Sequence, residues 1–92
     1  MATYKNPYPP NYESRIRAVF LYDPEVSFNE WARRLGVDRK AIYSYRDCVS
    51  LPNAWKIHLL CKYTGCSADW LINGTGKAPE WYKEGNNGLQ GG

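Results

Sequence analysis

The chain has 92 residues, of which 43% are hydrophobic and 23% charged, and its formal net charge is +3. This length fits one small domain with an ordinary apolar core. The mild positive charge permits nucleic-acid binding without requiring it. No stretch is apolar enough for a signal peptide or a membrane-spanning helix, so we expect no membrane partner.

Three cysteines, Cys48, Cys61 and Cys66, form an odd set without a short paired pattern. A disulfide framework would favour an even number, so a reducing cytoplasm is the better expectation. His58 could be added to the three as a zinc ligand, but the spacing matches no common zinc motif. We therefore expect small buried cysteines, with no metal and no cofactor.

The first 11 residues contain three prolines and predict an extended N-terminal arm. Asn11 is expected to cap a first helix that runs to about Leu21. Pro24 marks the break that follows this helix. Three apolar residues at helical spacing are expected to face the core: Ile16, Val19 and Phe20.

Two short helices are predicted next, separated by a tight turn. Ser27 and Glu30 have the spacing of a capping box, in which both side chains satisfy free amides at the start of the second helix. Gly36 ends that helix, because a left-handed residue is often needed there. Asp38 then caps a third helix that runs to about Arg46.

The two short helices have the pattern of a helix-turn-helix. Ala32 is small and lies where the helices cross. The apolar contacts between and behind them come from Trp31, Leu35, Val37 and Ile42. The outward positions of the third helix carry Arg39, Lys40, Tyr43 and Ser44. A buried elbow beneath a polar, basic helix is typical of proteins that enter the DNA major groove.

The second half of the chain predicts two more helices. A loop over 48–53 leads to Asn53, which caps a fourth helix from about Ala54 to Tyr63, and Gly65 ends it. Ser67 caps a short fifth helix over 68–72. Its buried anchors are Trp70 and Leu71.

The remaining chain bears on the domain limits. Residues 12–83 are expected to form the domain, and 84–92 a flexible tail or the start of a linker, because they are rich in Gly and Asn. Trp55 is expected near the exposed start of the fourth helix, beside DNA or a dimer partner. Trp81 could fold back on the domain or pack across a two-fold axis.

Two stretches, SFNEWARRLGVDRKAIYSYRD and YTGCSADWLINGTG, resemble the phage repressor and Cro-like helix-turn-helix family, the lambda-repressor-like fold. With the helix between them, the resemblance covers roughly residues 13–76. It implies an all-α, compact five-helix domain with the helix-turn-helix as helices 2 and 3. It also implies a recognition helix in the major groove and a homodimer, at least on DNA, bound to a near-palindromic operator.

The resemblance assigns base contacts to the outward face of the third helix. Arg39 suits the O6 and N7 edge of guanine, whereas Lys40 suits a base or a phosphate equally well. Tyr43 offers its ring to a thymine methyl group or its hydroxyl to a phosphate. Ser44 could contact a base edge or a phosphate. The alternative for each is an ordinary solvated or packed helix residue.

Backbone contacts are expected from three places. The start of the second helix, at Ser27 and Phe28, presents free amides and the positive end of a dipole. Many family members have Gln where Phe28 stands, so the phosphate contact of that Gln is absent. The remaining candidates for phosphate contacts are Arg34, Ser50, Asn53 and Lys56.

No catalytic constellation competes with this interpretation, so we do not expect an enzyme. The leading hypothesis is a transcriptional repressor, encoded by a phage or prophage and acting at the nucleoid in the bacterial cytoplasm. One alternative is a protein-interaction module of the same fold, such as an antitoxin or anti-repressor. Another is the DNA-binding half of a longer repressor whose C-terminal domain makes it oligomeric.

Overall fold

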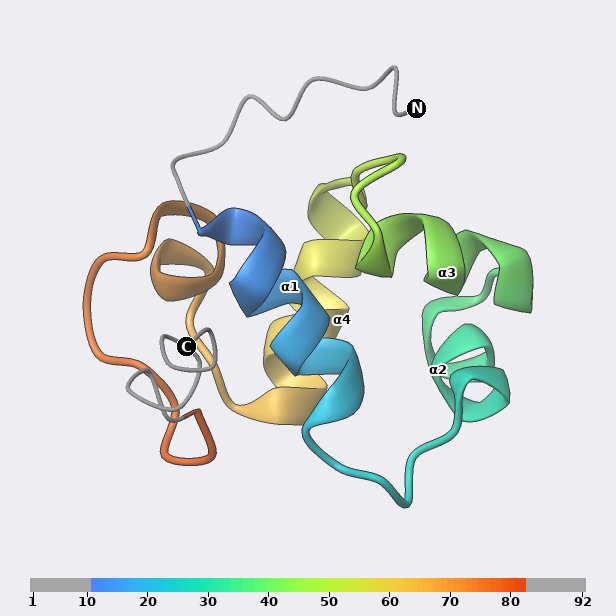
Figure 1. Cartoon of the computed structure of the whole chain (residues 1–92), viewed down its shortest axis with the longest axis horizontal. Coiled ribbons are helices and arrows are strands. Elements are labelled where there is room, and N and C mark those ends of the chain that lie inside the picture. Colours follow the sequence, from blue (N-terminus) through green and yellow to red (C-terminus); the bar gives the residue numbers. More distant parts are fainter. Residues whose placement is uncertain (1–10, 83–92) are drawn as a thin grey trace.

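The computed structural model describes residues 11–82 and is all-helical (Figure 1). Its elements are α1 (Tyr12–Leu21), α2 (Phe28–Leu35), α3 (Arg39–Arg46), α4 (Ala54–Thr64) and the short η1 (Asp69–Asn73). Over these residues there is no strand, so the expected all-α class with five helices is confirmed. Apart from Asn11, the expected arm over 1–11 and the expected tail over 84–92 lie outside the described residues.

Helix α1 lies in the middle of the domain and contacts α3 on one side and η1 on the other (Figure 1). Helices α2 and α3 pack against each other, and α2 also contacts α4. The expected inward residues of α1 are buried, as are Trp70 and Leu71 of η1. The largest fully buried side chains come from every helix: Tyr12, Ile16, Val19, Phe20, Trp31, Ile42, Leu60 and Leu71.

Three of the predicted caps are present. The side chains of Ser27, Asp38 and Asn53 accept hydrogen bonds from the amides three residues later, at 3.1, 3.0 and 2.9 Å. Each such cap stabilises a helix by about 1 kcal/mol. Gly36 and Gly65 end α2 and α4 with φ of 71° and 82°, in the left-handed region that was expected for them.

Two details differ from the sequence predictions. Asn11 precedes α1 but makes no side-chain capping bond, because its φ of 77° is left-handed and not the extended conformation that capping requires. The fifth helix is a π-helical turn and lies one residue later than predicted. The Ser67 hydroxyl nevertheless accepts the amide of Trp70 at 3.0 Å, so this predicted cap is confirmed.

The segment after η1 folds back on the domain. The ring of Trp81 stacks on Tyr22 with centroids 4.0 Å apart, and its indole N–H donates to the carbonyl oxygen of Thr64 at 2.8 Å. Trp81 also meets Trp70 edge to face at 5.9 Å. Of the two alternatives for Trp81, packing against its own domain is therefore the one observed.

Candidate nucleic-acid interface

The turn between α2 and α3 holds the two helices at a fixed angle. Gly36 closes α2, and the amide of Val37 then donates to the carbonyl oxygen of Ala32 at 3.0 Å. Ala32 is 7% exposed, which fits a close helix crossing, and Ile42 of α3 is fully buried in the same core. The outer side of α3 is thus supported from below by packed side chains.

The four residues predicted to contact bases all lie on α3. Arg39, Lys40 and Tyr43 are exposed, and Ser44 is half-buried. The guanidinium of Arg39 reaches back to the side-chain oxygen of Asn29 in α2, at 3.4 Å. This long, exposed bond leaves Arg39 able to turn towards a ligand.

Beside this outer side, three side chains form a cluster that the sequence analysis did not identify. The rings of Phe28 and Tyr43 meet at 5.1 Å with an interplanar angle of 60°. The guanidinium of Arg46 lies 5.4 Å from the first ring and 5.1 Å from the second. Arg46 follows Tyr43 by three residues and Arg39 by seven, so helical periodicity could have placed it with them.

The carboxylate of Asp47 holds Arg46 in place. Nε and Nη2 of Arg46 donate to its two oxygens at 2.8 and 2.9 Å. These bonds hold the pKa of the Asp47 carboxyl below its usual value, although partial burial opposes the shift. Arg17 of α1 approaches the same carboxylate at 3.9 Å. The negative charge of Asp47 is therefore compensated by neighbouring cations.

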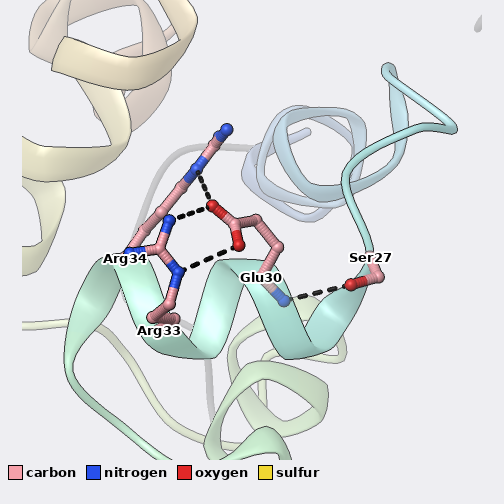
Figure 2. Close-up of polar contacts among 4 residues, drawn as sticks. All are labelled: Ser27, Glu30, Arg33 and Arg34. Carbon is pink, nitrogen blue, oxygen red and sulfur yellow. Dashed lines mark hydrogen bonds and ion pairs between the residues drawn. The ribbon is translucent and has the colours of Figure 1, made fainter.

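The Glu30 carboxylate of α2 has different partners from those predicted (Figure 2). The Ser27 hydroxyl caps the amide of Glu30, but the Glu30 carboxylate turns to Arg33 and Arg34. Nε of Arg33 donates at 3.0 Å and Nε of Arg34 at 3.2 Å, and the pKa of Glu30 is lowered chiefly by the bond from Arg33. The predicted capping box is therefore wrong in its second half, because two cations compete for the carboxylate.

Arg34 was predicted to contact the DNA backbone, and the structure gives it a different environment. Its guanidinium lies 5.1 Å from the ring of Trp31 and 4.7 Å from that of Tyr63 in α4. Only 22% of its side chain is exposed. With its charge paired to Glu30 and its plane against two rings, Arg34 joins α2 to α4 and is poorly placed for phosphate.

The loop between α3 and α4 is attached to α3 by its backbone. The carbonyl oxygen of Ser44 accepts the amides of Val49 and Ser50, at 2.9 and 3.3 Å. This pairing brings Ser50 next to α3, and Asn53 and Lys56 follow at the start of α4. The Asn53 side chain is occupied as a cap, so a backbone contact here would use first-turn amides of α4, the hydroxyl of Ser50 or the Lys56 ammonium.

Side-chain and backbone contacts therefore join three segments into one surface, which we call the α3 surface. Asn29 and Phe28 connect the first turn of α2 to α3, and Ser44 connects α3 to the loop. The exposed residues predicted to contact DNA belong to these segments. The side chains that lie on or beside this surface are Phe28, Asn29, Arg39, Lys40, Tyr43, Ser44, Arg46 and Ser50.

The cysteines do not point to a metal site. Cys61 and Cys66 bring their sulfurs to 3.9 Å beside an open hollow of about 530 Å³ between α4 and η1, which His58 also lines. Within residues 11–82 no group of three or more His, Cys, Asp or Glu side chains could hold a metal ion. Over the same range no helix is both long and apolar enough to span a bilayer.

Comparison of the chain with family models, with curated proteins and with solved structures gave no match. A function for this protein therefore has to be argued from the geometry and chemistry of the α3 surface.

Proposed function

We propose that the protein is a sequence-specific DNA-binding regulator of transcription that places α3 in the major groove. The observation that carries the proposal is the contrast between the two sides of α3. Ile42 is fully buried, whereas Arg39, Lys40 and Tyr43 on the other side are exposed. A supported helix with open cationic and aromatic side chains has the chemistry that base edges and phosphates require.

The dimensions of α3 agree with this role. Its eight residues make about two turns of helix. An α-helix with its side chains is about 10–12 Å across, so it fits the major groove, which is about 12 Å wide. Arg39 at the first turn would read guanine, Lys40 would contact a base or a phosphate, and Ser44 would lie near the groove edge.

Backbone contacts would flank α3 on both sides. On one side are the first-turn amides of α2 around Phe28, and on the other are Ser50 and the start of α4 with Lys56. Two such domains on neighbouring turns of the groove would add their contacts, so the proposal includes a homodimer on a near-palindromic operator. The proposed regulator would be a phage or prophage protein that represses transcription in the bacterial cytoplasm.

Selection of bound oligonucleotides from a random duplex pool tests the proposal. We expect an enriched site with two related halves about one helical turn apart. Affinity for that site should then fall by orders of magnitude between about 50 and about 200 mM salt, because phosphate contacts release counterions.

Failure to enrich any site would overturn the proposal. So would binding that is insensitive to salt. Tight, salt-insensitive binding to a protein instead would favour the interaction module of antitoxin or anti-repressor type. A non-cognate duplex of the same length serves as the control for general affinity.

A further inference from the structure

Phe28, Tyr43 and Arg46 form a preorganised apolar patch on the α3 surface. Phe28 comes from the first turn of α2 and Tyr43 from the middle of α3, and their rings meet at 5.1 Å. Aromatic pairs in this tilted arrangement attract each other beyond the effect of burial, so the Tyr43 ring has a defined position before any ligand arrives. Tyr43 nevertheless remains 40% exposed to solvent.

The cation in the cluster already has partners within the protein. Arg46 packs its guanidinium within about 5 Å of both rings and donates two hydrogen bonds to Asp47. Its charge is thus used within the protein. What the cluster offers to the outside is ring surface, next to the cationic residues Arg39 and Lys40.

We propose that Phe28 and Tyr43 together bind the 5-methyl group of a pyrimidine in the major groove. The inference rests on the proposed function and adds the ligand group that this part of the surface selects. In the major groove the one methyl group that unmodified base pairs present is the C5 methyl of thymine, and G·C pairs have none. A 5-methylcytosine presents the same group, so the chemistry recognised is the methyl and not the base.

The position of Phe28 strengthens this assignment. A side chain at the start of α2 that donated hydrogen bonds would serve a phosphate, but a phenyl ring has no such donor. The Phe28 ring instead packs against the Tyr43 ring in a tilted, edge-type contact. An apolar ring pair next to base-reading cations gains free energy from covering a methyl group, and it gains nothing comparable from a cytosine edge.

Removing single methyl groups from the DNA tests the inference without altering the protein. In the selected operator each thymine is replaced in turn by deoxyuridine, and the Kd is measured by fluorescence anisotropy. We expect about a fourfold loss at one position per half-site, and little change at the others. At that position, 5-methylcytosine paired with guanine should bind more tightly than cytosine by a similar factor.

Protein variants then locate the methyl contact. With Tyr43→Ala, thymine and deoxyuridine should bind equally at the sensitive position, whereas Tyr43→Phe should retain the difference. Phe28→Leu should reduce it, and Arg39→Ala should lower affinity while the difference persists. Circular dichroism melts establish that each variant is folded.

Two results would overturn the inference while leaving DNA binding intact. One is equal affinity for thymine and deoxyuridine at every position. The other is a thymine–deoxyuridine difference that persists in full in Tyr43→Ala, which would show that another side chain covers the methyl group. Absence of any selected operator would instead overturn the proposed function itself.

Discussion

Nε of Arg15 in α1 donates a 3.0 Å hydrogen bond to the carbonyl oxygen of Leu71 in η1, 56 residues later in the chain. Nη2 of the same guanidinium donates to the carbonyl oxygen of Ile72 at 3.1 Å. The side chain is 5% exposed, so these bonds form away from water. A charged residue of the first helix thereby fixes the last one, whose carbonyl oxygens would otherwise lack partners at the helix end.

Replacing Arg15 with methionine should lower the free energy of unfolding by about 3 kcal/mol. The substitution keeps much of the apolar stem but leaves the carbonyl oxygens of Leu71 and Ile72 without their donors. Guanidinium chloride denaturation followed by circular dichroism measures the change. The exposed Arg17 of the same helix provides the control, because Arg17→Met should cost less than about 1 kcal/mol. Equal losses in the two variants would contradict the role of Arg15.

Gly74 should tolerate a side chain less well than Gly76, although both have left-handed backbones, with φ of 76° and 82°. A Cβ at Gly74 would lie 2.9 Å from Nη1 of Arg15, whereas one at Gly76 would meet nothing within 4 Å. Alanine at Gly76 should therefore cost only the left-handed strain, about 1 kcal/mol. Alanine at Gly74 should cost about 3 kcal/mol, because it also displaces the guanidinium. Similar melting temperatures for the two variants would show that the Arg15 guanidinium can move aside without lowering the stability of the domain.

Arg34→Ala should destabilise the domain by about 2 kcal/mol. The substitution removes the contacts of the guanidinium with Trp31 and Tyr63, and it also breaks the partly buried ion pair with Glu30. Arg33→Ala is the matched control, because it removes the same charge from a side chain that is 73% exposed, and it should change the stability much less than Arg34→Ala does. Urea denaturation compares the two. If Arg33→Ala were the more destabilising variant, the packing role of Arg34 would be wrong.

Local chemistry made much of this fold predictable. The caps Ser27, Asp38 and Asn53 each act on an amide three residues away, and Gly36 ends its helix through its own φ. Such features depend on a few consecutive residues, and a sequence pattern contains them in full. The burial of Ile42 opposite the exposed side of α3 also follows from helical period alone.

The features that sequence reasoning missed depend on side chains that meet across the fold. Arg15 was not identified as buried, because no residue near it in the chain indicates that its partner is the carbonyl oxygen of Leu71, 56 residues away. Arg34 was predicted to contact the DNA backbone from the second helix, yet its guanidinium packs against Tyr63 of α4. Long cationic side chains reach several neighbours, and the tertiary structure decides which one they choose.

Stability should fall at alkaline pH through Cys48, a residue that is only 8% exposed. Burial raises the pKa of Cys48 from 9.0 to about 11. Above pH 9 the unfolded chain loses this proton while the folded chain keeps it, so the free energy of unfolding decreases until the pH passes the folded pKa. The loss from this group should approach about 2 kcal/mol between about pH 9 and about pH 11.

This contribution is isolated by denaturing the reduced protein and its Cys48→Ala variant in parallel at a series of pH values and comparing their free energies of unfolding. The alanine variant should lose less stability on going from about pH 8 to about pH 10.5, while tyrosine and lysine titrations remain common to both proteins. Parallel pH profiles for the two proteins would show that ionisation of Cys48 is not linked to unfolding.

Arg39→Ala and Lys56→Ala remove one positive charge each and should affect DNA binding differently. Arg39 is exposed on α3, where it can meet a base edge, so its loss should cost about 1–3 kcal/mol of operator affinity and relax the preference at one base pair. Lys56 lies in the first turn of α4, where the proposed docking assigns it to the phosphate backbone. Its loss should weaken binding to all sequences alike and reduce the salt slope by about 1. Anisotropy titrations with the operator and with single-base-pair variants, each at several salt concentrations, separate the two effects. If Arg39→Ala kept the full sequence preference, or Lys56→Ala changed it, the roles assigned to α3 and to α4 would have to be exchanged.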